Sequence, residues 1–109
     1  MPYIKVDTNV VVENKEKIKS LLGSIITTIP GKKEWMTAVS INDNSDLYFG
    51  GSSKACAVVD TLVNAGTDHS RNKEYSDAII NMISEELKIP RNRIYVIVQE
   101  QDYWFAVSE

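Results

Sequence analysis

The residue with the most chemistry to offer in this 109-residue chain is Pro2, which follows Met1. Methionine aminopeptidases remove an initiator methionine when the next residue is small, and proline qualifies, so we expect a mature chain that begins with a free prolyl amine. An α-amino group titrates around pH ~7.7–8.0 in solvent, and burial disfavours its charged form. A prolyl nitrogen beside an apolar pocket would therefore be a neutral base at physiological pH. Its position alone, however, favours the simpler interpretation of Pro2 as a permissive second residue.

The other reactive side chains form no familiar catalytic constellation. The chain contains one cysteine, Cys56, and one histidine, His69. A single cysteine rules out an intramolecular disulfide and fits a reducing compartment. No clustered ligand spacing indicates a metal, and no Cys–His or Ser–His pair stands in a convincing context, so we expect neither a metal nor a cofactor. We interpret Cys56 as a small core side chain and His69 as a solvated loop residue.

The composition is that of an ordinary globular domain, and it excludes several classes of partner. A net charge of −3 gives no basic surface for nucleic acid or anionic membranes. No apolar run approaches the ~20 residues that cross a bilayer, and charged residues near the start argue against a secretory signal. We therefore expect one domain over residues 1–109, without nucleic-acid or membrane partners. We expect it in the cytoplasm, with secretion without a signal peptide as the alternative.

The elements that would position Pro2 follow from the periodicity of the apolar residues. A strand is expected at the start, with Ile4, Val6 and Thr8 on one face. Asn14 is suited to cap a helix that ends at Pro30-Gly31, because proline cannot continue the helical hydrogen bonds and glycine takes a left-handed cap. The buried face of this helix recurs at spacings of three and four. Its members are Ile18, Leu21, Leu22, Ile25, Ile26 and Ile29.

The rest of the chain predicts one more helix and three more strands. A loop over residues 66–71 would lead into the second helix, with Asn72 or Ser70 as its cap. The apolar stripe of this helix would end before Pro90. A strand buried on both faces is expected where the residues are mostly apolar and β-branched. The three strands are expected over residues 35–41, 55–63 and 94–99, and the second of them is the one buried on both faces.

The two halves of the chain are alike, which predicts the fold. Val6-Asp7-Thr8 recurs as Val59-Asp60-Thr61, and a second short match follows in the same order. Each half reads strand–helix–strand, a right-handed crossover unit in nearly all cases. We therefore predict an α+β fold in which two βαβ repeats, about residues 1–50 and 51–109, form a four-stranded mixed sheet with two helices on one face. The other face needs a cover that no third helix supplies, so we expect an obligate oligomer.

Five short motifs extend over nearly the whole chain: Met1-Pro2 opening a strand that ends Asp7-Thr8-Asn9-Val10; Gly31-Lys32; Phe49-Gly50-Gly51-Ser52-Ser53 with Cys56; Asn72 with Tyr75-Ser76; and Arg91-Asn92-Arg93-Ile94-Tyr95. Together they resemble the tautomerase superfamily, in its macrophage migration inhibitory factor and D-dopachrome tautomerase branch. The Phe-Gly-Gly-Ser-Ser motif is specific in this context. The resemblance implies a ring-shaped homotrimer with active sites between neighbouring subunits, and it reverses the interpretation of Pro2.

The resemblance also implies roles for four residues. In the family the N-terminal proline is the catalytic base that moves a proton between carbon and oxygen in a keto–enol pair, which implies that role for Pro2. Lys32 matches a lysine that meets the substrate's carboxylate or carbonyl oxygen, and its charge would lower the pKa of the prolyl amine. Asn64 matches a backbone donor to the substrate, and Tyr95 matches a tyrosine that lines the site from the neighbouring subunit. Without the resemblance, Lys32 would be interpreted as a solvated loop residue and Tyr95 as a core or interface aromatic.

The chain departs from the family pattern near the expected site. Lys33 stands where the family usually has proline, Val63-Asn64-Ala65 replaces Ser-Ile-Gly, and Ile97 stands where the vertebrate cytokine has asparagine. The usual C-terminal ending is reduced to residues 103–107. The resemblance implies a small aromatic α-keto acid such as phenylpyruvate, or a dopachrome-like compound, as substrate. The alternatives are a cytokine-like binding protein with a vestigial pocket and a receptor as its partner, or a trimer with only an interaction role.

Overall fold

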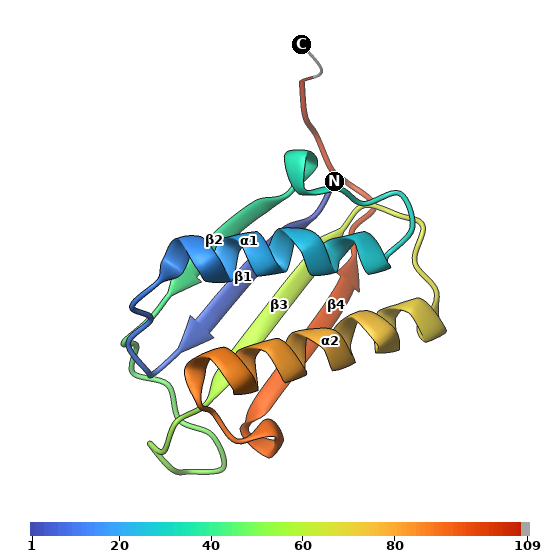
Figure 1. Ribbon diagram of the computed structural model, residues 1–109. Helices are drawn as coiled ribbons and strands as arrows, with labels where there is room; N and C mark the ends of the chain where they lie inside the picture. The colour runs from blue at the N-terminus through green and yellow to red at the C-terminus, as the bar shows by residue number, and fades with distance from the viewer. Residues whose placement is uncertain (108–109) are drawn as a thin grey trace.

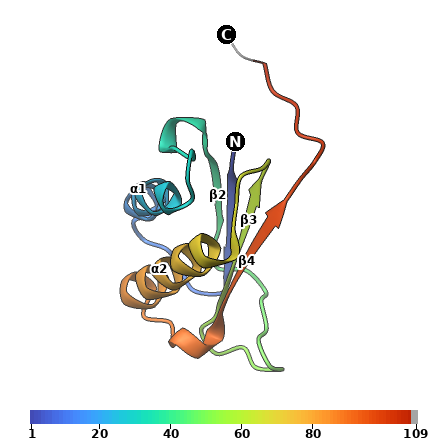
Figure 2. The same cartoon turned by 90° about the vertical axis from the view of Figure 1, so that its right-hand side faces the viewer.

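The computed structural model describes residues 1–107 and confirms the α+β architecture expected from the two repeats. Four strands form one mixed sheet in the order β2-β1-β3-β4, and both helices lie on the same face of it (Figure 1). Seen edge-on, the opposite face carries no helix within these residues (Figure 2). The elements are β1 (Tyr3–Thr8), α1 (Lys15–Ile25), β2 (Ala38–Asn42), β3 (Ala57–Val63), α2 (His69–Leu87) and β4 (Ile94–Glu100).

The strand directions follow from the repeat. β1 runs parallel to β2, and β3 runs parallel to β4, so each half contributes one parallel pair. The halves join through β1 and β3, which are antiparallel, with Tyr3 opposite Leu62. The start of β1 therefore lies beside the end of β3, and the residues just outside these two strands meet at one end of the sheet (Figure 1).

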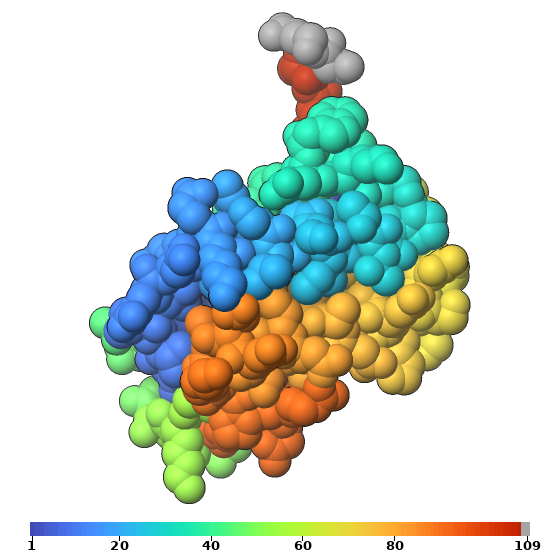
Figure 3. Space-filling view, in the orientation of Figure 1, coloured from blue at the N-terminus to red at the C-terminus, as the bar shows by residue number. Residues whose placement is uncertain are grey.

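The core lies between the sheet and the two helices. Ile4, Val6 and Val59 point from the sheet into this layer and are completely buried. Burial alternates along β3, so that its other face, which includes Val58 and Leu62, is only half-buried. The expectation that this strand is buried on both faces is therefore wrong for the single chain. From outside, the two helices pack against each other and form the surface seen in Figure 3.

The second strand is shorter than the sequence pattern predicted. Trp35 lies in a 3₁₀ turn, Glu34–Met36, and its side chain is 83% exposed. The backbone N–H of Thr37 donates to the carbonyl of Glu34 at 3.0 Å, which turns the chain there instead of extending it. The strand β2 therefore begins only at Ala38, and the prediction that it starts at Trp35 is wrong.

The first helix has the predicted cap, and the second does not. The side chain of Asn14 accepts the backbone N–H three residues further on at 3.0 Å, which satisfies one of the free donors of the first turn. In α2 this role belongs to Asp68, which accepts the backbone N–H of Arg71 at 2.8 Å. The prediction of Asn72 or Ser70 is therefore wrong, because the helix already begins at His69 and includes both residues.

Candidate active site at the start of the first strand

Lys32 reaches the end of the sheet from the connection between α1 and β2. The chain leaves α1 through a 3₁₀ turn, Ile26–Thr28, and Gly31 adopts a φ of +80°, which glycine takes without steric cost. The backbone N–H of Lys32 then donates to the carbonyl of Ile29 at 3.1 Å. As a result Lys32 is buried, with 8% of its surface exposed, whereas Lys33 is exposed. The lysine that the motif indicated is the one that turns inward.

Pro2 is buried immediately before β1. Its carbonyl accepts the backbone N–H of Ala38 at 3.0 Å, which ties it to the first residue of β2. Because proline has no amide N–H, its place at the head of a strand costs no sheet hydrogen bond. Met1, by contrast, is 36% exposed, so burial rises over a single residue.

Asn64 follows β3 directly and connects two amines. Its Oδ1 atom accepts a hydrogen bond from the Met1 amino group at 2.7 Å and another from the Lys32 ammonium at 3.0 Å. A carboxamide oxygen has two lone pairs, so both bonds can be made at once. Three of the four expected site residues, Pro2, Lys32 and Asn64, therefore lie together at one end of the sheet.

We call Met1, Lys32 and Asn64 the amine cluster. Its surroundings disfavour protonation of the Met1 amino group. Desolvation by burial is the main cause that lowers the pKa of the Met1 amine, followed by the positive charge of Lys32 and its hydrogen bond. The pKa of Glu100 is also lowered, first by hydrogen bonds from Thr67 and to a smaller extent by the charge of Lys32. The site thus combines an amine that loses its proton easily with a fixed cation, which is the pairing that a base acting on an anionic substrate requires.

Tyr95, the fourth expected residue, lies at the opposite end of the sheet. It pairs with Val58 at the beginning of β3, whereas Asn64 follows the end of that strand. Its ring packs against Phe49 with centroids 4.6 Å apart, and the residue is 61% exposed. Tyr95 therefore does not meet Pro2 within one chain, and it can line the site only across a contact between subunits.

The loop around the Phe-Gly-Gly-Ser-Ser motif is held by Arg93 and Asn9, two residues to which the sequence assigned no role. Phe49 and Ser52 form a bridge around Gly50 and Gly51, which both have the positive φ that a type I′ turn requires. Arg93 lies over the ring of Phe49, with its guanidinium carbon 5.2 Å from the ring centroid. The guanidinium also donates to the backbone carbonyls of Phe49, Ser52, Lys54 and Ala55 at 3.0–3.2 Å.

Asn9 holds the same loop from β1. Its Nδ2 atom donates to carbonyls at both ends of the motif, and its Oδ1 atom accepts the backbone N–H of Cys56 at 2.9 Å. A hollow of about 240 Å³ lies beside the loop and includes Tyr95 in its lining. The aromatic end of the sheet is therefore held rigid by side chains from both halves of the chain.

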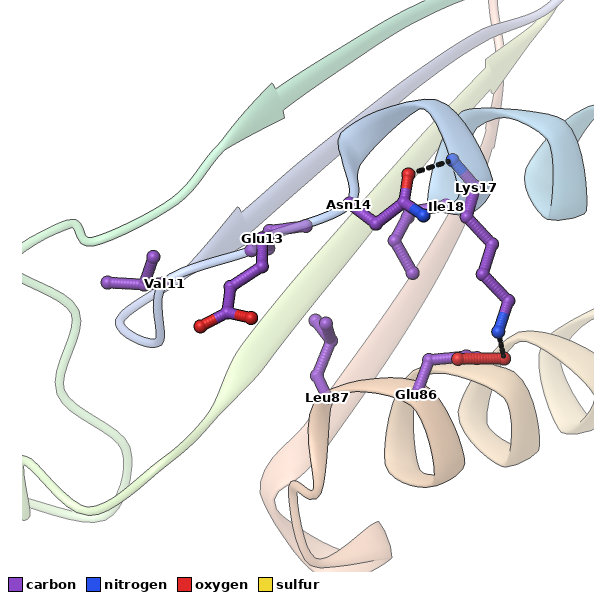
Figure 4. A pocket seen from close by; sticks show the side chains of 8 residues that line it. Val11, Glu13, Asn14, Lys17, Ile18, Glu86 and Leu87 are labelled. Atoms are coloured by element: carbon purple, nitrogen blue, oxygen red, sulfur yellow. Dashed lines mark hydrogen bonds and ion pairs between the residues drawn. The ribbon is translucent and has the colours of Figure 1, made fainter.

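A further hollow, of about 320 Å³, lies between the start of α1 and the end of α2 (Figure 4). Lys17 and Glu86 form an ion pair of 3.0 Å there and link the two helices. None of the four expected site residues contributes to it, so it does not belong to the candidate site. Its lining consists of Val11, Val12, Glu13, Asn14, Lys17, Ile18, Glu86 and Leu87.

The described part of the chain contains neither a candidate metal cluster nor a candidate membrane-spanning helix. Residues 1–107 contain no group of three or more His, Cys, Asp or Glu side chains placed to hold a metal ion. In the same part of the chain, no helix combines the length and the apolar character needed to cross a membrane.

Comparison with known families matches the sequence model of macrophage migration inhibitory factor to residues 1–104. The chain belongs to the macrophage migration inhibitory factor family. A homologue of this factor from Trichinella spiralis is 30% identical over 97 residues, which cover 88% of this chain and 85% of the relative. A Xenopus laevis protein named D-dopachrome decarboxylase-B is 27% identical over 107 residues, which cover 95% and 90% of the two chains.

The fold agrees with this assignment to the macrophage migration inhibitory factor family. The crystal structure of Leishmania major MIF2 superposes with a TM-score of 0.86 and covers 97% of this chain and 93% of that one, at 23% identity. The four-stranded sheet with two helices is therefore the fold of solved family members. The resemblance inferred from the sequence motifs is confirmed.

The departures from the macrophage migration inhibitory factor pattern fall in four places, of which the first is Lys33, an exposed residue beside the buried Lys32. Asn64 lies in the amine cluster, in contact with Lys32. Ile97 lies on the uncovered face of the sheet, opposite Asp60, and is 41% exposed. Residues 103–107 form no helix or strand and extend away from the sheet (Figure 2).

Proposed function

We propose that this protein is a cofactor-independent keto–enol tautomerase that uses Pro2 as its general base once Met1 has been removed. The observation that carries this proposal is the burial of Pro2 at the head of β1, next to the point where the Met1 amine and the Lys32 ammonium meet at Asn64. A general base works best with a pKa near the operating pH, and burial and the nearby cation both lower the pKa of the amine found there. Pro2 is buried whereas Met1 is exposed, so removal of Met1 would leave the new terminal amine at the head of β1, near the same cation.

The reaction divides into steps that these residues perform. The Pro2 nitrogen takes a proton from the carbon next to the keto group. The electron pair of that C–H bond forms a carbon–carbon double bond, and the keto oxygen takes up negative charge and then a proton from water. The prolyl ammonium releases its proton to water, which restores the neutral base. Lys32 holds the carboxylate or carbonyl oxygen of the substrate, and the backbone N–H of Asn64 donates a further hydrogen bond. Donors fixed in advance around the developing charge lower the barrier.

The substrate class is a small aromatic α-keto acid such as phenylpyruvate, or a dopachrome-like compound. The name of the Xenopus relative, D-dopachrome decarboxylase-B, supports the second option. The site is completed in a homotrimer, where the neighbouring subunit's Tyr95 supplies part of the wall. In favour of this assembly, Tyr95 and Ile97 leave apolar surface on the uncovered sheet face, and such surface is usually covered by a partner.

The test is the conversion of phenylpyruvate between its keto and enol forms by the wild type and by Pro2→Gly. Glycine is also small, so Met1 should still be removed, which mass spectrometry of both proteins verifies. Glycine leaves a primary amine in place of the constrained secondary amine, so we expect kcat to fall, at most by the roughly 10²–10⁴-fold that general base catalysis typically contributes. Pro90→Gly makes the same change at an exposed position at the other end of the sheet and should keep its activity.

Three results would count against the proposal. Equal activity of Pro2→Gly and the wild type would remove Pro2 from the mechanism. A stable monomer in sedimentation at micromolar concentration would remove the shared site. A processed trimer without activity would favour the alternative of a binding protein with a vestigial pocket.

A further inference from the structure

The orientation of the Asn64 side chain is dictated by its partners. The Lys32 ammonium lies 3.0 Å from one end of the carboxamide, and an ammonium group can only donate hydrogen bonds. The atom that faces Lys32 must therefore be the oxygen. The usual ambiguity between the oxygen and nitrogen of an asparagine side chain does not arise here. This holds after loss of Met1 as well, because Lys32 alone imposes it.

With the oxygen turned toward Lys32, the amide nitrogen Nδ2 points away from it and presents two N–H donors. No acceptor among residues 1–107 forms a hydrogen bond with Nδ2, whereas Oδ1 takes part in two. Asn64 is exposed at the end of β3, so these donors are open to a ligand. The amine cluster thus offers a cation and a neutral donor side by side.

We propose that the Asn64 side chain binds the 2-oxo oxygen of the substrate through Nδ2. This inference rests on the proposed function and adds a side-chain donor to the backbone donor. In a 2-oxo acid the carboxylate and the keto oxygen are on adjacent carbons. A carboxylate bound to Lys32 therefore brings its keto oxygen next to a group that is itself hydrogen bonded to Lys32.

A donor at this oxygen acts in two ways. It favours acids that carry a 2-oxo group over acids that lack one, because only the 2-oxo oxygen accepts a hydrogen bond from Nδ2 within the complex. It also stabilises the enolate more than the ketone, because negative charge collects on this oxygen as the proton leaves. Asn64 stands where the family pattern has isoleucine, and Ile97 stands where the vertebrate cytokine has asparagine.

The test compares the binding of two inert probes by calorimetry. Phenylglyoxylate carries a 2-oxo group but no hydrogen on the carbon next to it, so it cannot enolise. Phenylacetate has the same ring and carboxylate without the oxo group. We expect the wild type to bind phenylglyoxylate about tenfold more tightly, as one good hydrogen bond allows. In Asn64→Leu, whose side chain has no donor, the two affinities should agree within about twofold.

Two further variants separate this role from a structural one. Asn64→Asp keeps a side-chain oxygen for Lys32 but has no side-chain donor, so it should also lose the preference for phenylglyoxylate. This holds even where the negative charge of the aspartate lowers the affinity for both probes. Asn92→Leu makes the same change as Asn64→Leu at an exposed residue at the far end of the sheet and should keep the wild-type ratio. Circular dichroism and sedimentation of each variant check that the fold and assembly persist.

A preference that survives in Asn64→Leu or Asn64→Asp would overturn the inference, as would a wild type that binds the two probes equally or binds neither. Because neither probe is turned over, these results do not depend on Pro2 acting as a base. Failure of the proposed function would appear separately. Phenylpyruvate turnover would be absent, or equal in the wild type and Pro2→Gly, while the preference for binding phenylglyoxylate persists.

Discussion

The hydroxyl groups of Thr61 and Tyr75 lie 2.6 Å apart in the core, where both residues are completely buried. This bond joins the middle of β3 to α2 across the apolar layer between sheet and helices. Burial raises the pKa of Tyr75 far above its usual value, although the bond to Thr61 acts in the opposite direction. The tyrosine hydroxyl therefore stays neutral, and each hydroxyl depends on the other for its hydrogen bond.

Removing one of these two hydroxyls should destabilise the fold more than the loss of one hydrogen bond implies. Tyr75→Phe leaves the buried hydroxyl of Thr61 without its hydrogen-bond partner. Thr61→Val does the same to the hydroxyl of Tyr75. Each change should lower the free energy of unfolding by about 1–3 kcal/mol, because an unpaired buried polar group carries its full desolvation cost. The double variant should cost less than the two single costs together. Urea unfolding of the four proteins measures this, and additive costs would contradict it.

Arg93→Lys should loosen the loop over residues 47–56. The guanidinium of Arg93 donates to four backbone carbonyls in this loop, and a lysine ammonium cannot reproduce its planar fork. We expect a loss of about 1–3 kcal/mol of stability and faster hydrogen exchange of the amides of Phe49 and Ser52. Arg91→Lys, an exposed change in the same 3₁₀ turn, is the matched control. Unchanged exchange in Arg93→Lys would show that other contacts hold the loop.

Lys32→Met should raise the pKa of the terminal amine. Burial and then the charge of Lys32 lower the pKa of the Met1 amine in the unprocessed chain, and methionine removes that charge while filling similar space. The amine should then titrate at higher pH, and the acid side of the pH–rate profile should move in the same direction. Titration of the amine by nuclear magnetic resonance measures the shift without any need for turnover. Lys33→Met, at the exposed neighbour, should shift the amine less, and a larger shift there would contradict our assignment.

Asp68 should make the stability of the fold sensitive to acid. A hydrogen bond from the backbone N–H of Arg71 is the main cause that lowers the pKa of Asp68, followed by the hydroxyl of Ser70. A carboxyl whose pKa is lower in the folded state stabilises the fold above its unfolded pKa, and this contribution disappears as the pH falls through the folded pKa.

Asp68→Asn tests this cap without removing it. Asparagine keeps an oxygen for the helix N-terminus but does not titrate. Thermal unfolding followed from about pH 7 to about pH 2 should therefore show a smaller loss of stability for the variant than for the wild type. Parallel curves for the two proteins would mean that other carboxyl groups account for the acid sensitivity.

The fold was predictable because two independent patterns in the sequence, the alternation of apolar residues and the internal repeat, indicate the same sheet. Alternation placed Ile4 and Val6 on the buried face, and both are completely buried. The repeat of Val6-Asp7-Thr8 as Val59-Asp60-Thr61 has a direct structural counterpart, since Val6 and Val59 lie opposite each other where the two halves meet. The two sequence repeats therefore correspond to the two halves of the sheet, which meet at β1 and β3.

The parts that could not be predicted depend on contacts between distant residues or on competing local signals. Nothing near Asn64 in the sequence indicates that its side chain meets Lys32, because the contact arises only when β1 and β3 pair. Trp35 fitted an alternating pattern, but a turn hydrogen bond within four residues prevailed over it. Asp68, Ser70 and Asn72 are all residue types that cap helices well, and only the position at which α2 begins decides which of them does so.

The close spacing at the head of β1 has a practical consequence for producing the protein. Pro2 is already buried and β1 begins at Tyr3, so no flexible link separates the chain start from the sheet. Residues added ahead of Pro2 by an affinity tag would emerge beside Lys32 and Asn64 and would convert the secondary amine into an amide. A tag after β4, where the chain extends away from the body (Figure 2), leaves this amine intact. Under the proposed mechanism, preparations tagged at the N-terminus should therefore be inactive until the tag is cut off at Pro2.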